Sequence, residues 1–323
     1  MFLVLRARSP ALDSGLKYTL TIHTYPGHKG HSMSTSNTAV NLREAIKNLD
    51  SLPALPLIAQ KLLTLNVDTD EGQRQMLALI EQDPQILAKV IGLANSPALG
   101  NTRQTSSISE AALLLGISRI KSVATGMAMM SVNAGSTTGN FNLHDLWMHN
   151  LGIAFAMLAI SKAMPKKARP QDDYIFLAGM LHDIGYIALA HLDPQRSNEL
   201  HTYQAANTDR PAIEIERSLL DICHDELGAA LALRWNLPRE IISVIRHHHT
   251  PDAAEAPQDQ PLIRMVYMAE KILPSFGMSE HVEPGISDAD WQALGIAPDQ
   301  AEEILVQVAE QADQATLFAA NLG

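Results

Sequence analysis

From Val40 to the C-terminus, apolar residues recur at helical spacing, and no stretch alternates apolar and polar residues as a half-buried strand does. Leucine, alanine and isoleucine abound, whereas aromatic residues make up only 5% of the chain. Strands draw on β-branched and aromatic residues, so this composition favours helices that pack on helices. The sequence therefore predicts an all-α fold.

Proline, glycine and Asn-Ser clusters divide this pattern into successive helices. Ser107 stands three residues before Glu110, the spacing of a capping box, and predicts a helix that starts there and runs to Leu115. The other expected helices span residues 57–65, 71–81, 86–94, 120–132, 143–164, 173–192, 241–245 and 262–273, and residues 213–235 cover one or two more.

Residues 1–40 differ from the rest of the chain. They carry scattered Thr, Ser, His, Gly and Pro without a sustained helical period, which predicts a disordered N-terminal segment. Met33 is a hypothetical alternative start, and in that case the first 32 residues lie upstream of the natural protein. We interpret His23, His28 and His31 as part of the disordered tail and not as a metal site.

The remainder divides into a main domain at 41–275 and an acidic helical tail at 276–323. Residues 133–140, rich in Gly, Ser and Thr, form the clearest internal linker. In the tail, Ile304, Leu305 and Val308 predict an amphipathic helix. We expect this helix to pack on the domain; a partner surface is the alternative.

Charge and cysteine content narrow the possible partners. The net charge of −11 repels phosphate backbones, and no Lys/Arg run is interleaved with aromatics, so we expect no nucleic-acid partner. The single cysteine, Cys223, excludes an intramolecular disulfide and fits a reducing compartment. A buried structural cysteine is preferred over a nucleophile paired with His224. No apolar stretch approaches the roughly 18 residues of a membrane span, so we expect a cytoplasmic protein without a membrane partner.

The string Leu181-His182-Asp183-Ile184-Gly185 carries the strongest chemical signal. Adjacent imidazole and carboxylate groups suit Fe, Mn, Zn or Mg. His149, His224 and the run at 247–249 lie on other expected helices, and such residues can converge inside a bundle to hold a divalent metal that activates water. The alternative is that the three consecutive histidines form a surface loop and the others are incidental. Spacing alone leaves both interpretations open.

Several motifs resemble those of the HDOD domain, a relative of the HD phosphohydrolases. They are Leu52-Pro53-Ala54-Leu55-Pro56, Ile80-Glu81-Gln82-Asp83-Pro84, Leu93-Ala94-Asn95-Ser96, the segment 107–116, Trp235-Asn236-Leu237-Pro238 and His248-His249-Thr250-Pro251. The resemblance covers roughly residues 45–275. It implies an HD-domain-like multi-helix bundle with an N-terminal helical subdomain, and a stand-alone bacterial protein of signal transduction or regulation.

HDOD domains are generally regarded as having lost the full HD set of metal ligands, and this chain departs from that norm. The resemblance implies metal ligands at His149, His182, Asp183, His224, His248 and His249. Glu270 stands where the final Asp of the HD pattern is expected. Its extra methylene shifts the carboxylate by about one C–C bond length, which can distort a mononuclear site.

A second departure concerns the phosphodiesterases of the HD-GYP type. They usually have a lysine after the His-Asp-Ile-Gly string, where this chain has Tyr186, and the Gly-Tyr-Pro motif is absent. Hydrolysis of cyclic di-GMP by that route is therefore not expected.

Two functions follow from the resemblance. The first is a regulatory HDOD module with a retained metal site that binds a signalling protein or a small phosphorylated ligand. The alternative is a metal-dependent phosphohydrolase. There, His149, His182, Asp183 and Glu270 would hold one metal, and His224, His248 and His249 a second or the substrate phosphate. Asp183 would bridge the metals as the catalytic residue. We place the regulatory module first; a nucleic-acid-associated regulator is opposed by the charge.

Overall fold

A computed structural model describes residues 40–95, 104–132, 141–257, 260–273, 277–278, 281–282 and 285–320, with side chains up to residue 310. Residues Val40–Gly323 form one compact unit. The described residues are helices, turns and loops without a strand, which confirms the all-α prediction. The expectations for the N-terminal segment and for the linker at 133–140 lie outside the described residues, and the division at 275/276 stays a prediction.

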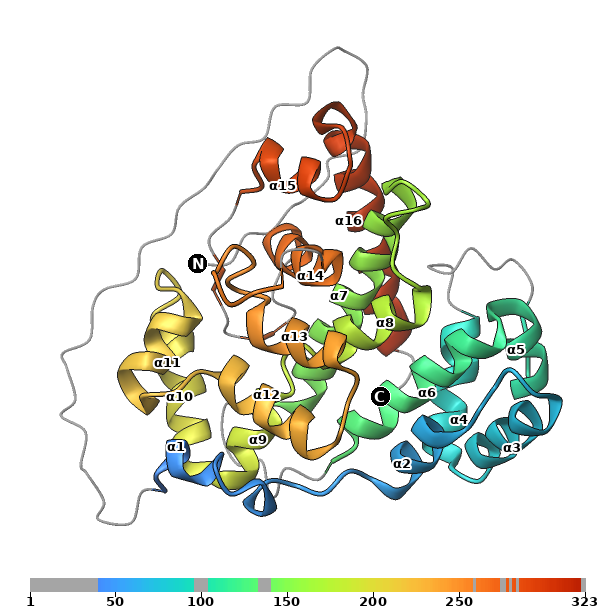
Figure 1. The fold of residues 1–323 in the computed structure, drawn as a ribbon, viewed down its shortest axis with the longest axis horizontal. Coiled ribbons are helices and arrows are strands. Elements are labelled where there is room, and N and C mark those ends of the chain that lie inside the picture. The colour runs from blue at the N-terminus through green and yellow to red at the C-terminus, as the bar shows by residue number, and fades with distance from the viewer. Residues whose placement is uncertain are drawn as a thin grey trace. The chain divides into compact units, whose positions relative to one another are not determined.

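The N-terminal helices gather at one side of this unit, at the right of Figure 1. Those at the right are α2 (Leu57–Thr64), α3 (Asp70–Glu81), α4 (Pro84–Ala94), α5 (Ile108–Leu115) and α6 (Ile117–Met130). Helix α1 (Leu42–Ala45) lies apart from them at the left, and the 3₁₀ turn η1 (Leu49–Ser51) follows it. Ser107 caps α5 as predicted, since its hydroxyl accepts from the backbone N–H of Glu110. The Glu110 carboxylate, however, accepts from the N–H of Ser106 and not of Ser107.

The central helices are α7 (Leu143–Ala163), α8 (Asp172–Leu181), α9 (Gly185–Leu192), α10 (Pro194–Ala206), α11 (Ala212–Leu220), α12 (His224–Arg234), α13 (Arg239–His247) and α14 (Pro261–Ile272). Every residue of α7 from Leu146 to Ser161 is buried, so this helix forms the middle of the bundle. The helix predicted at 173–192 is interrupted at His182–Ile184. The segment predicted at 213–235 is interrupted at 221–223, where Asp221 takes a left-handed conformation (φ 59°).

Together α8 and α9 correct one expectation about length. Asp172–Leu192 is a 21-residue helical stretch that is long and apolar enough for a membrane span. Of an apolar 18-residue window within it, 89% is buried inside the bundle, and core helices of soluble proteins can be equally long and apolar. The helices α5 and α6 pass it as a pair, but they bend by 117° at Gly116.

The C-terminal elements are α15 (Asp288–Ala293), the 3₁₀ turn η3 (Pro298–Gln300) and α16 (Ala301–Ala320). Helix α16 packs against α7, as expected for the tail. Ile304 and Val308, one turn apart, are buried. Leu305 is 39% exposed, so its assignment to the apolar face was wrong.

Candidate metal centre

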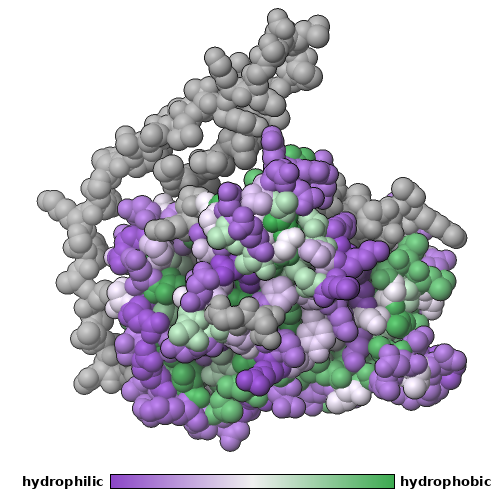
Figure 2. All heavy atoms as spheres, turned by 45° about the horizontal axis from the view of Figure 1, so that its top comes forward, coloured by the Kyte–Doolittle hydropathy of each residue, from purple (hydrophilic) through white to green (hydrophobic). Residues whose placement is uncertain are grey.

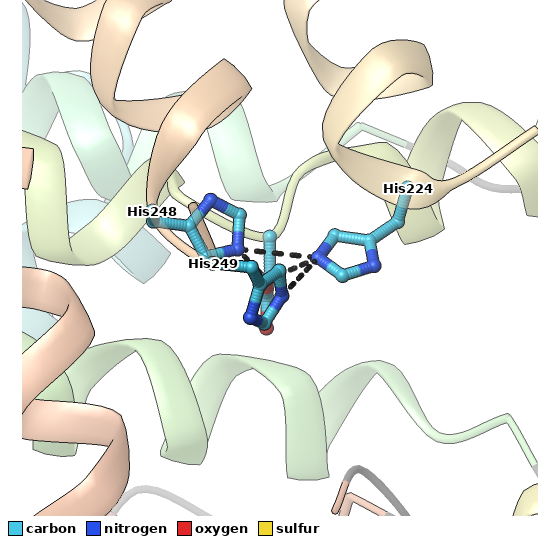
Figure 3. Close-up of side chains that lie close together, drawn as sticks. His224, His248 and His249 are labelled. Carbon is cyan, nitrogen blue, oxygen red and sulfur yellow. Dashed lines mark hydrogen bonds and ion pairs between the residues drawn. The ribbon is translucent and has the colours of Figure 1, made fainter. Parts of the chain in front are cut away.

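The seven residues proposed from the sequence come together in the interior of the bundle. They are His149 in α7, His182 and Asp183 in the turn between α8 and α9, His224 at the start of α12, His248 and His249 just after α13, and Glu270 in α14. Figure 3 shows His224, His248 and His249 pointing toward one another. The interpretation of the consecutive histidines as a surface loop is therefore wrong for His248, which is fully buried, whereas His247 is half-buried and outside the cluster.

Two glycines allow the close approach of these helices. A β-carbon at Gly185 would lie 1.8 Å from the carbonyl oxygen of His224, and one at Gly179 would lie 2.5 Å from the Cα of Ala154. Gly185 therefore lets the turn with His182 and Asp183 lie against the start of α12. Gly179 lets α8 lie against α7, which carries His149.

The donor atoms form two groups that share Asp183. In position A, His149 Nε2, His182 Nε2 and Asp183 Oδ2 form a nearly equilateral triangle with sides of 3.2, 3.3 and 3.4 Å. Glu270 Oε1 lies 3.4 Å from His182 Nε2 on this side.

Position B combines Asp183 Oδ1 with three imidazoles. His224 Nε2 lies 3.2 Å from Asp183 Oδ1, 3.2 Å from His248 Nε2 and 3.0 Å from His249 Nε2. His248 Nε2 lies 3.5 Å from Asp183 Oδ1. Glu270 Oε2 faces His249 Nδ1 at 3.5 Å.

These separations fit metal coordination. With metal–ligand bonds of about 2.1 Å, neighbouring donors lie about 3.0 Å apart in an octahedron and about 3.4 Å apart in a tetrahedron. The distances within positions A and B span 3.0–3.5 Å. The donor types and their spacing therefore fit one divalent ion at each position.

The tautomers of two imidazoles also fit metal binding. The Nδ1 atoms of His182 and His248 lie 2.8 Å from the carbonyl oxygen of Gly179 and 3.0 Å from that of Ile245. Because a carbonyl only accepts, these Nδ1 atoms donate, and in neutral rings the Nε2 atoms hold lone pairs. Metal-binding histidines typically have this arrangement, in which a hydrogen bond from Nδ1 fixes the ring and Nε2 is free to bind the metal.

The carboxylates need a cation nearby. Both oxygens of Asp183 and both of Glu270 are buried without a hydrogen-bond partner. Burial opposes their charged forms, but the neighbouring histidines lower the pKa of Asp183 well below its usual value and that of Glu270 to about 2. Burial lowers the pKa of His182, yet Asp183 and Glu270 raise it to about 10. A divalent ion would replace such protons as the balancing charge.

Two further residues belong to the site: Glu216, which was missed from the sequence, and Tyr186, which the sequence marked only as the replacement of the HD-GYP lysine. Glu216 in α11 is fully buried and lies 2.9 Å from His224 Nδ1. The hydroxyl of Tyr186 donates to Glu216 Oε1 at 2.7 Å, so this side chain is directed into the core behind His224. No motif marked Glu216; its place in the buried face of α11, beside Ala212 and Ile215, was the available signal.

Cys223 precedes His224 but takes no part in the centre. It is a buried free thiol whose Sγ lies 3.6 Å from the carbonyl oxygen of Ile213. Burial, with Glu216 nearby, raises the pKa of Cys223 to about 12, so the nucleophilic thiolate is disfavoured. These features agree with a structural cysteine.

Known proteins resemble this chain in sequence and fold. An uncharacterized protein of Treponema pallidum is 29% identical over 238 residues, which are 73% of this chain and 44% of that protein. Ribonuclease Y of Thermus thermophilus is 33% identical over 107 residues, 33% of this chain and 12% of that enzyme. The chain thus spans less than half the length of either relative.

Among solved structures, an HDOD domain protein of unknown function from Geobacter sulfurreducens is similar with a TM-score of 0.66 and 25% identity. The match covers 87% of this chain and 95% of that structure. The model of the HDOD domain family matches residues 52–251, more than half of the chain. This protein therefore belongs to the HDOD domain family.

Proposed function

We propose that this HDOD protein is a metal-dependent phosphohydrolase that acts on a phosphoester. The observation that carries the proposal is Asp183, which presents Oδ1 to one group of imidazoles and Oδ2 to another. The sequence alone favoured the regulatory module. The seven donors at coordination spacing favour the phosphohydrolase, because a site kept only for packing would not need paired donor groups around a shared carboxylate.

The roles of the residues follow from their positions. His149, His182, Asp183 and Glu270 would hold one ion, and Asp183, His224, His248 and His249 the other. Divalent ions would supply Lewis-acid polarisation of the phosphoryl group and a lowered pKa of water. Asp183 keeps the two positions adjacent, and the buried imidazoles keep the donors oriented.

The exposure of the donors indicates where a substrate approaches. The His249 side chain is 11% exposed, whereas the other six are exposed by at most 5%. We infer that the phosphoester enters past His249. A small phosphorylated ligand fits this low exposure, and the net charge of −11 disfavours a nucleic-acid polymer. The buried Cys223 thiol supports a cytoplasmic location.

The test is hydrolysis of bis(p-nitrophenyl) phosphate and p-nitrophenyl phosphate by the Mn²⁺-loaded protein. His248→Ala removes a donor of position B and is expected to lower kcat on the order of 100-fold or more, since loss of supporting groups alone costs 10–100-fold. His247→Ala is the matched control, because His247 lies next in the chain but outside the cluster, and its rate should stay near wild type. Equal rates for the two variants, or an inert wild type, would refute the proposal.

The regulatory module remains a second candidate because of two observations. The donors are almost completely buried, and Tyr186 offers no cation to the phosphate at the position of the HD-GYP lysine. A regulatory module would bind a signalling protein or a small phosphorylated ligand, and it would retain metal without hydrolysing the ligand. A wild-type protein that binds metal stoichiometrically but cleaves neither ester would favour this candidate.

A further inference from the structure

Behind His224 lies a buried carboxylate that holds this residue by both its backbone and its side chain. The backbone N–H of His224 donates to Glu216 Oε2 at 2.8 Å. Its Nδ1 lies 2.9 Å from both carboxylate oxygens. Since a carboxylate only accepts, Nδ1 carries the proton and Nε2 is left to face position B.

Glu216 is itself fixed by the residues around it. Tyr186 donates its hydroxyl to Oε1 at 2.7 Å, and Gln204 Nε2 lies 3.5 Å from the same oxygen. The Tyr186 ring stacks on the His224 ring with centroids 4.5 Å apart and planes at 24°. The imidazole therefore has little freedom to turn away from position B.

Position A has no such support. His149 Nδ1 is buried without a hydrogen-bond partner, and His182 Nδ1 is held by a neutral carbonyl. A carboxylate partner makes an imidazole a more basic ligand and adds a fixed negative charge near the ion. Position B also has three imidazoles, whereas position A has two, with Glu270 as its second carboxylate.

We propose that the two positions fill unequally: position B binds a divalent ion tightly, position A binds one weakly and exchangeably, and Glu216 is the positioning residue that creates this difference. The inference rests on the metal centre of the proposed function but does not require turnover. The second ion would then load only when free metal is plentiful, so metal supply would regulate the centre.

The experiment is a titration of the chelator-treated full-length protein with Co²⁺. Calorimetry measures the affinity of each binding event, and the visible absorption of Co²⁺ reports its coordination. Wild type should show two binding events of different affinity. His249→Ala, which removes a donor of position B, should weaken the tighter event. His149→Ala, which alters position A alone, should weaken the other. These variants assign each event to a position.

Glu216→Gln then tests the cause. The tighter event should weaken about 10–100-fold and its Co²⁺ absorption should shift, while the weaker event stays unchanged. Glu214→Gln is the matched control: this carboxylate lies two residues before Glu216 in the same helix but is exposed, outside the cluster. It should change neither event. Circular dichroism checks folding, and if Glu216→Gln does not fold, Tyr186→Phe should weaken the same event by a smaller factor.

The outcomes separate the two proposals. Two equal events in wild type, or a Glu216→Gln effect confined to the event that His149→Ala removes, would overturn the inference while phosphoester hydrolysis could stand. Unequal binding with the expected Glu216 effect but no hydrolysis would support the inference and overturn the proposed function. A wild type that binds no Co²⁺ would overturn both.

Discussion

The helices α2–α6 and the helices α7–α14 bury different kinds of side chain. In the described residues between α2 and α6, the buried polar side chains are hydroxyls: Thr105, Ser122 and Thr125. Ser122 and Thr125 donate to carbonyls one turn earlier in their own helix. From α7 to α14 the buried polar groups include four histidines and three carboxylates of the network around Asp183, namely His149, His182, His224, His248, Asp183, Glu216 and Glu270.

This difference shows that family membership and chemistry depend on different residues. The HDOD motifs in the N-terminal half act structurally. Asp83 caps α4, and the Asn95 side chain bonds the backbone N–H and C=O of Thr105. The Trp235 indole donates to the carbonyl of Pro53 at 2.9 Å and ties this half to the end of α12. A chain can keep these contacts with or without a metal centre, so the family alone does not decide the function.

The largest effect is expected from Asp183→Ala, because both donor groups share this residue. Metal content measured by elemental mass spectrometry in excess metal should fall from about two ions per chain to nearly none. The stability that metal adds should be lost as well, about 2.7 kcal/mol when the free ion is at 100 times its Kd. Chelator should therefore lower the Tm of wild type but not that of the variant. Full metal content in the variant would show that the donors act separately.

Much of this centre could be predicted because its residues lie in recognisable strings. The turn at His182–Ile184 was hidden in a continuous apolar pattern, since Gly185 and the apolar residues around it fit a helix equally well. Leu305 was wrongly assigned to the buried face of α16. It is adjacent to Ile304 in the sequence, and successive residues of a helix point in different directions, so Ile304 is buried and Leu305 is exposed.

Glu216 could not be predicted for a different reason. It lies eight residues before His224 in another helix, and it reaches the imidazole only because the chain reverses at Asp221. Likewise, the sequence shows that Tyr186 replaces a lysine but not that its hydroxyl is directed at Glu216. Such contacts depend on how helices pack, which spacing along a chain does not specify.

The second prediction separates stability from metal binding with two glycine-to-alanine substitutions, one at the metal centre and one among the N-terminal helices. Gly185→Ala places a β-carbon against the His224 carbonyl, so the start of α12 must move, at a cost of about 1–3 kcal/mol. Gly116→Ala has open space but a φ of 86°, a region that costs other residues a similar 1–3 kcal/mol. Both variants should have a lower Tm than wild type, and only Gly185→Ala should lose metal at position B. Equal metal content in two folded variants would contradict the role assigned to Gly185.

The smallest effect is expected at the surface of the N-terminal helices. Leu113 is 87% and Leu57 is 65% exposed, and Figure 2 shows hydrophobic patches at the right, over this part of the molecule. Exposed single positions of this kind contribute within about 0.5 kcal/mol to stability. Leu113→Asp should therefore leave the Tm and the metal content near wild type, as measured by calorimetry and elemental analysis. A buried equivalent in the same helix, Ala111→Asp, should instead unfold the N-terminal half, because it places an unpaired charge in the core. If Leu113→Asp altered metal content, the helices α2–α6 would be coupled to the metal centre through α5 and α6. Packing in α2–α6 and chemistry in α7–α14 would then not be independent.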